Sequence, residues 1–65
     1  MTFTNREKAE CAKREVKQRI RAYKRWVEEK RMSEQFADEQ IAMMQEIAND
    51  YERMAESEEA KERLL

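Results

Sequence analysis

Residues 30–39 have the sequence KRMSEQFADE and mark the boundary between a basic and an acidic half of the chain. Residues 1–32 contain 11 Lys and Arg against 5 Glu, a net charge of +6. Residues 33–65 contain 3 Lys and Arg against 10 Asp and Glu, a net charge of −7. The 65 residues include no glycine and no proline, so nothing interrupts a helix on either side of the boundary. We therefore expect a basic helix followed by an acidic one.

Ser33 is the best start signal for the acidic helix. Its hydroxyl can accept a hydrogen bond from a free backbone N–H of the first turn, and acids follow it from Glu34 to Glu39. The positive end of a helix dipole favours acids there. We expect a turn at about residues 31–33 and a second helix at about residues 34–62.

The first helix is expected to start near Asn5 and to end at about residue 31. Thr4 and Glu7 have the spacing of a capping box, in which each side chain satisfies the other residue's backbone N–H. Apolar residues then recur at steps of three and four and predict one inward stripe. The stripe consists of Ala9, Ala12, Val16, Ile20, Tyr23, Trp26 and Val27.

The second helix carries two apolar seams. The inner seam consists of Ala37, Ile41, Met44, Ala48, Tyr51 and Ala55. The outer seam consists of Phe36, Met43, Ile47 and Met54. The two lie about 80° apart around a helix, and one stripe on the first helix cannot cover both. We expect an all-α fold, an antiparallel two-helix hairpin that self-associates through the outer seam into a four-helix bundle.

A turn near residue 32 makes the numbers of facing residues sum to about 65. This register places Val16 near Ala48 and Ala9 near Ala55, with large residues facing small ones. It also places the basic helix beside the acidic one. We expect ion pairs between the helices that fix the antiparallel arrangement more than they add stability, since exposed pairs contribute about 0–1 kcal/mol each.

The first helix contains a dense block of bases that predicts an anion-binding face. Its members are Lys13, Arg14, Lys17, Arg21, Lys24 and Arg25. Beside them lies a candidate aromatic and basic cluster of Arg19, Tyr23, Trp26 and Lys30. The bases can neutralise phosphates and the rings can stack on a base or nucleotide. The alternative is that the bases pair with the acidic helix or remain solvated, and that the cluster is the edge of the core with some cation–π contact.

Enzymatic chemistry is not expected, because the chain has no histidine, no glycine and one cysteine, Cys11. These counts exclude a His/Cys metal cluster, a Cys-His nucleophile pair and a phosphate-binding glycine loop. We expect no metal and no cofactor, and a surface position for Cys11 on the polar side of its helix. With no long apolar run and no signal-peptide pattern, we expect a soluble cytoplasmic protein that does not bind membranes.

A pattern of residues extends over about residues 14–51 and consists of Arg14-Glu15-Val16, Arg19, Tyr23, Arg25-Trp26-Val27, Arg31-Met32-Ser33, Ala37, Gln40-Ile41, Met44, Ile47 and Asp50-Tyr51. In this pattern the chain resembles a group of short phage- and prophage-encoded proteins of unknown function. The group commonly has proline at the position of Lys24 and glycine at that of Lys30. These departures predict a straighter first helix and a less sharply specified turn.

The residues and the resemblance together imply a small phage-type accessory or regulatory protein that acts by macromolecular interaction, as a homodimer, on a host or phage protein. In that case it works in the cytoplasm of the host cell. The first alternative is binding of nucleic acid or an anionic nucleotide by the basic face, including sequestration of a host-defence signal. The second is a structural role in a virion or complex.

Overall fold

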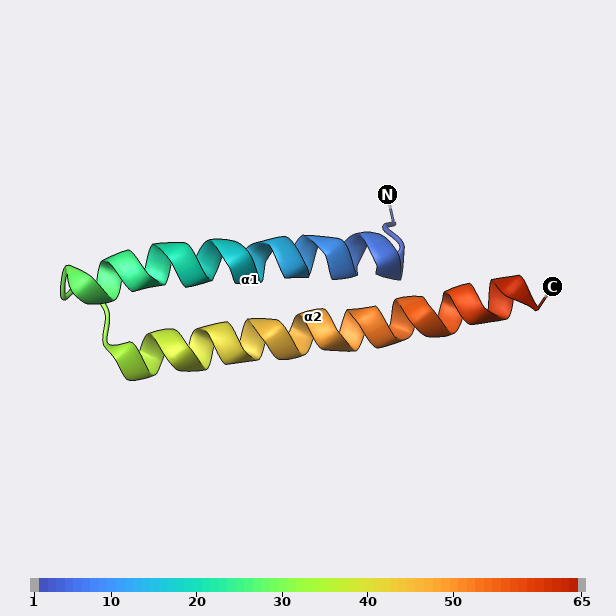
Figure 1. Ribbon diagram of the computed structural model, residues 1–65. Helices are drawn as coiled ribbons and strands as arrows, with labels where there is room; N and C mark the ends of the chain where they lie inside the picture. Colours follow the sequence, from blue (N-terminus) through green and yellow to red (C-terminus); the bar gives the residue numbers. More distant parts are fainter. Residues whose placement is uncertain (1, 65) are drawn as a thin grey trace.

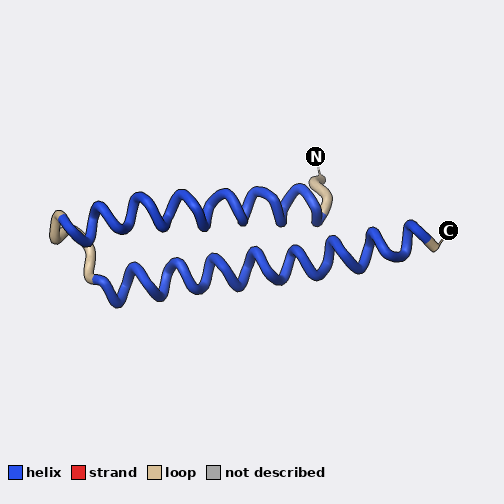
Figure 2. The backbone as a smooth tube through the Cα atoms, in the orientation of Figure 1, coloured by secondary structure: helices blue, strands red, loops and turns tan. Residues whose placement is uncertain are grey.

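The computed structural model describes residues 2–64 as a hairpin of two antiparallel α-helices (Figure 1). Helix α1 spans Asn5–Glu28 and helix α2 spans Glu34–Arg63. The described residues outside the helices form loops and turns (Figure 2). The molecule is elongated, 53 × 21 × 16 Å, and the end of α2 extends past the start of α1. The predicted all-α hairpin is confirmed for a single chain.

Both predicted helix starts are confirmed. The Glu7 backbone N–H donates to Thr4 Oγ1 at 3.0 Å, and the Thr4 N–H donates to Glu7 Oε1 at 3.0 Å, which completes the capping box. These contacts, the backbone N–H first and the hydroxyl second, hold the pKa of Glu7 below its ordinary value. Ser33 Oγ accepts from the Phe36 N–H at 3.1 Å and starts α2.

Helix α1 ends at Glu28, three residues before the predicted end, because a Schellman motif stops it. The Lys30 N–H donates to the Val27 carbonyl at 3.0 Å, and the Arg31 N–H donates to the Trp26 carbonyl at 2.8 Å. Lys30 takes the left-handed conformation, with φ at 61°. Because glycine is absent there, the sequence predicts a less sharply specified turn. Both hydrogen bonds of the motif nevertheless form. The left-handed conformation is energetically unfavourable for Lys30, because its side chain has a Cβ.

The core between the helices is made of small side chains. Its fully buried members are Ala9, Ala12, Val16, Ala37, Ala48 and Ala55. Ala12 and Val16 form one cluster with Ala48, against which Met44 packs. The contact of Val16 with Ala48 agrees with the predicted register. Large residues were expected to face small ones, but in this cluster Ala12 also packs with Ala48. Every residue of the inner seam is buried or half-buried, as predicted.

Two members of the stripe predicted on α1 are exposed, Ile20 and Trp26, whereas Tyr23 and Val27 are half-buried. Ile20 is 48% exposed and Trp26 is 37% exposed. At about 100° per residue, Ile20 lies about 40° to one side of Val16 and Trp26 about 80° to the other. A core of small residues brings only a narrow face of each helix into contact, so these larger side chains lie on opposite flanks of it.

Candidate functional site

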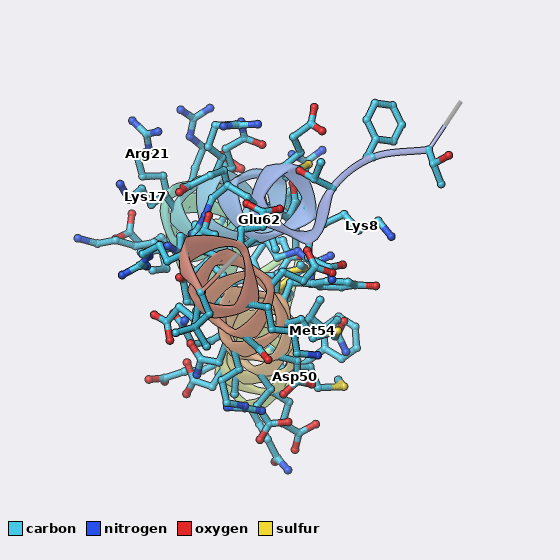
Figure 3. The ribbon with its side chains drawn as sticks, turned by 90° about the vertical axis from the view of Figure 1, so that its right-hand side faces the viewer. Lys8, Lys17, Arg21, Asp50, Met54 and Glu62 are labelled. Atoms are coloured by element: carbon cyan, nitrogen blue, oxygen red, sulfur yellow. The ribbon has the colours of Figure 1, made fainter. Side chains whose placement is uncertain are left out.

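The outer seam is the most exposed apolar feature of the helices. Phe36, Met43, Ile47 and Met54 are between 43% and 50% exposed. Helix α1 therefore leaves the outer seam uncovered, as the two-seam pattern predicts. Figure 3 shows Met54 on the same side of the hairpin as Lys8, whereas Lys17 and Arg21 lie on the other side. Lys17 and Arg21 of the basic block thus lie on a different side of the molecule from Met54, whereas Arg14 lines the groove between the two helices.

A groove of about 570 Å³ adjoins the outer seam where α1 and α2 meet. Residues of both helices and the N-terminal segment line it, among them Phe3, Cys11, Met44, Ile47 and Tyr51. Ile47 belongs to the groove and to the outer seam, so the two form one continuous apolar surface. Lys8 and Tyr51 both line the groove. The Lys8 Nζ lies over the Tyr51 ring, 5.6 Å from its centre, and makes a cation–π contact with it.

Phe3, Lys8 and Cys11 are among the groove residues that the sequence interpretation missed. Cys11 is exposed, as expected, but it borders the groove instead of lying on a purely polar face. Its spacing from Lys8 and Glu15, at steps of three and four, places all three on the flank of α1 that faces the groove. That helical spacing was the available signal. For Phe3, which precedes the helix, there was none.

Ion pairs join the helices at the end remote from the turn. Arg6 donates to Glu52 at 2.8 Å and holds both carboxylate oxygens of Glu59, at 2.8 and 3.0 Å. Lys13 also pairs with Glu52. The hydrogen bonds from Arg6 and then Lys13 lower the pKa of Glu52 to about 2, and the Arg6 hydrogen bond lowers the pKa of Glu59. The same contacts raise the pKa values of Arg6 and Lys13, so both stay protonated.

Most of the basic block does not pair with the acidic helix. Of its six members, Lys13 alone has a carboxylate within 4.0 Å among the described residues. The others are Arg14, Lys17, Arg21, Lys24 and Arg25, and all five are exposed. Arg14 also lines the groove between the helices, and Arg21 and Arg25 line a separate depression on α1. Pairing with an acid of α2 therefore accounts for one member of the block, Lys13. The base that pairs with both Glu52 and Glu59 is Arg6, which lies outside the block.

The aromatic and basic cluster is brought together only in part. The rings of Tyr23 and Trp26 stack with centroids 5.5 Å apart and planes at 28°. Arg19 instead pairs with Glu15 at 3.0 Å and donates to the Gln40 carbonyl at 3.2 Å. Lys30 forms the turn. In the described part of the chain the cation–π contact is the one between Lys8 and Tyr51, not one within this cluster.

A second, shallower depression of about 370 Å³ connects the basic block with the exposed Trp26. Gln18, Arg21, Ala22, Arg25 and Trp26 line it. Two guanidinium groups beside an indole can bind a phosphate and stack on a planar ring. This small group of residues, from one face of α1, is the part of the basic face best suited to an anionic ligand.

Other classes of site find no support within residues 2–64. There, no three Cys, Asp or Glu side chains come together in a group that could hold a metal ion. Neither helix is long and apolar enough, over the residues searched, to cross a membrane. Comparison with protein-family models, curated proteins and solved structures finds no match to the chain. The two surfaces, one apolar and one basic, are therefore what any assignment of function has to be built on.

Proposed function

We propose that this chain is a non-enzymatic accessory protein of the cytoplasm that acts by macromolecular interaction as a homodimer. The observation that carries the proposal is the outer seam, whose four large apolar side chains remain about half exposed in the hairpin. Monomeric soluble proteins rarely expose a continuous apolar surface of this kind, and larger ones mark interaction sites. The groove beside Ile47 extends that surface onto α1.

The small core supports the same proposal. Its buried residues are five alanines and one valine, so the hairpin removes little apolar surface from water on folding. Scaffolds of this length rarely obtain more than a few kcal/mol from one core and often need oligomerisation. Covering the outer seam with a second copy would bury four large exposed side chains of each chain.

Light scattering during size-exclusion chromatography tests self-association. We expect the wild type to be a dimer at micromolar concentration and a variant with Met43→Lys and Ile47→Lys to be monomeric or unfolded. The matched control adds the same charges at Ala42 and Asn49, which are exposed on another face of α2, and stays dimeric. A wild-type monomer, or a seam variant that is still dimeric, contradicts the proposal.

Binding of a nucleic acid or an anionic nucleotide is the second candidate function. It is favoured by the depression where Arg21 and Arg25 flank Trp26, and by the five bases of the block that have no acid partner among residues 2–64. Because Lys17 and Arg21 lie on a different side of the hairpin from Met54 (Figure 3), a dimer formed through the outer seam would leave these bases of both chains open to a ligand.

The fluorescence of Trp26, the single tryptophan of the chain, measures such binding directly. We expect quenching by an oligonucleotide or a nucleotide at low salt, with log affinity falling by about 0.9 per log unit of salt for each phosphate contacted. For an oligonucleotide, replacing Arg21 and Arg25 by Gln should flatten that slope by about two units. Arg53→Gln, on α2, is the control. No binding at low salt removes this candidate.

A further inference from the structure

We propose that two copies of the chain pair antiparallel along α2, with a twofold axis at the level of Gln45. The inference rests on the self-association proposed above and adds the orientation and register of the two chains. It follows from the order of residues on the uncovered side of α2, from the charges beside the outer seam, and from the position of the groove. Figure 3 shows two labelled residues of this side, Asp50 and Met54, close together.

The uncovered side of α2 has a symmetric sequence of positions. Between the residues of the outer seam lie Gln40 and Asp50, and the complete row is Phe36, Gln40, Met43, Ile47, Asp50 and Met54. The steps are four, three, four, three and four, the spacing of a helix that packs lengthwise against another helix. The row has the same steps in either direction, and its midpoint is residue 45. A second copy running the opposite way therefore presents the same spacing.

Antiparallel pairing brings chemically matched residues together along this row. Phe36 meets Met54 of the second copy, and Met43 meets Ile47 of the second copy, so large apolar side chains cover one another. Gln40 meets Asp50 of the second copy, and an amide N–H₂ can donate to a carboxylate. Each pair occurs twice because of the twofold axis.

Parallel pairing in register is disfavoured by Asp50. It would place the two Asp50 carboxylates opposite each other in the middle of an apolar interface, where like charges are costly. It would also align every acid of α2 with its own copy. In the antiparallel arrangement Arg53, which pairs with Asp50 within one chain, comes level with Ala37 of the second copy and about 3 Å along the helix axis from its Glu39. An acid and a base are then neighbours at this point beside the outer seam.

The size of the hairpin and the groove fit the same arrangement. A typical stable interface covers about 800 Å² on each partner. With dimensions of 53 × 21 × 16 Å, the long faces of the hairpin are large enough for such an interface. The groove lies at the level of Ile47, which is where Met43 of the second copy comes. An unbranched methionine side chain adapts well to an irregular gap.

Distances between spin labels, measured by pulsed EPR, test the orientation. Cys11→Ser removes the native thiol, and labels are attached to Glu46→Cys or Glu56→Cys, two exposed positions outside the row. At 1.5 Å per residue, the antiparallel register separates the two copies of position 46 by about 3 Å along the helix axis, and those of position 56 by about 33 Å. A parallel dimer in register separates neither pair along the axis.

Each result bears on one of the two proposals. A short distance for position 46 with a long one for position 56 supports the antiparallel register. Two short distances, or a short distance for position 56 alone, overturn that register and leave the homodimer standing. The absence of a distance between chains at concentrations where the labelled protein is folded overturns the homodimer itself.

Charge pairing at the ends of the row gives an independent test. A variant with Phe36→Lys and Met54→Glu places opposite charges together only if the chains are antiparallel. A control with Phe36→Lys and Met54→Lys places like charges together in both orientations. We expect the first variant to dimerise at least about tenfold more tightly than the control at low salt, with the difference shrinking at high salt. Parallel chains would show little advantage, since each lysine would then face a lysine and each glutamate a glutamate.

Discussion

The two ends of the hairpin are held together by different means. At the end remote from the turn, Ala9 and Ala55 are fully buried, and Arg6 joins Glu52 and Glu59. Near the turn, Ile20 and other large side chains are half exposed, and the Arg19 hydrogen bond to the Gln40 carbonyl is the main polar contact between the helices. The chain connection already keeps the helices together near the turn. At the far end, direct contacts have to do so, which explains why close packing and ion pairs concentrate there.

Overpacking the remote half should have the largest effect. Ala48 is 1% exposed and contacts Ala12 and Val16, so Ala48→Leu has no room for its side chain. We expect a loss of about 2 kcal/mol, and a Tm lower by about 10 °C in a chain of this size. Circular dichroism at fixed protein concentration measures it, because the Tm of a self-associating protein depends on concentration. Ala42→Leu, on the exposed face of α2, should leave Tm within a few degrees of the wild type.

Truncations on α1 compare a buried side chain with an exposed one at the point where the packing changes. Val16 is buried and Ile20, one turn later, is half exposed. Val16→Ala should cost about 1–2 kcal/mol, whereas Ile20→Ala should cost less than about 1 kcal/mol although it removes more atoms. Chemical denaturation curves of the two variants measure the difference. Equal losses would show that Val16 and Ile20 do not differ in burial in solution.

Local signals account for the features that the sequence predicted best. Thr4 with Glu7, and Ser33 alone, specify helix starts because the hydrogen bonds they make depend only on neighbouring residues. The inner seam was predictable because its period of three and four is regular along the whole helix. That one helix cannot cover both seams followed from their angular separation, and the exposed outer seam agrees with it.

The sequence was less informative where the answer depends on three-dimensional placement. The end of α1 was predicted three residues too late because Lys30 takes a left-handed conformation that a lysine does not signal. Ile20 and Trp26 fit the helical period but lie on the flanks of the narrow contact face. Net charge predicted that the helices attract each other, but not that Arg6 and Lys13 make the ion pairs between them while the rest of the block stays solvated.

Acid should loosen the remote end. Because the folded state lowers the pKa of Glu52 to about 2, the stability it contributes is present above the ordinary carboxyl pKa of 4.5 and is lost as the pH falls from about 5 toward 2. Glu59 acts in the same direction. We expect Tm to fall across this range, and Glu52→Gln to lower Tm by a few degrees at pH 7 and to flatten its pH dependence.

Glu56→Gln is the control for the acid experiment. Glu56 is exposed on α2 and makes no ion pair within residues 2–64, so this variant should keep the wild-type pH profile. Added salt should weaken the wild type only modestly, since the pairs are partly exposed. A Tm that is constant from pH 7 to pH 2 would mean that the ion pairs between the helices do not form in solution.

The turn offers the smallest effect, and one that increases stability. Lys30 has φ at 61°, a conformation that costs a residue with a Cβ about 1–2 kcal/mol and costs glycine almost nothing. Lys30→Gly should remove this cost, but part of the gain in stability is lost because glycine has more conformational freedom in the unfolded chain. We therefore expect Lys30→Gly to stabilise the fold by about 0.5–1 kcal/mol and to raise Tm by a few degrees. Lys30→Ala removes the same charge but keeps a Cβ, and should give no gain. If alanine and glycine raised Tm equally, the benefit would come from removing the charge, and the left-handed conformation at the turn would not be the source of the strain.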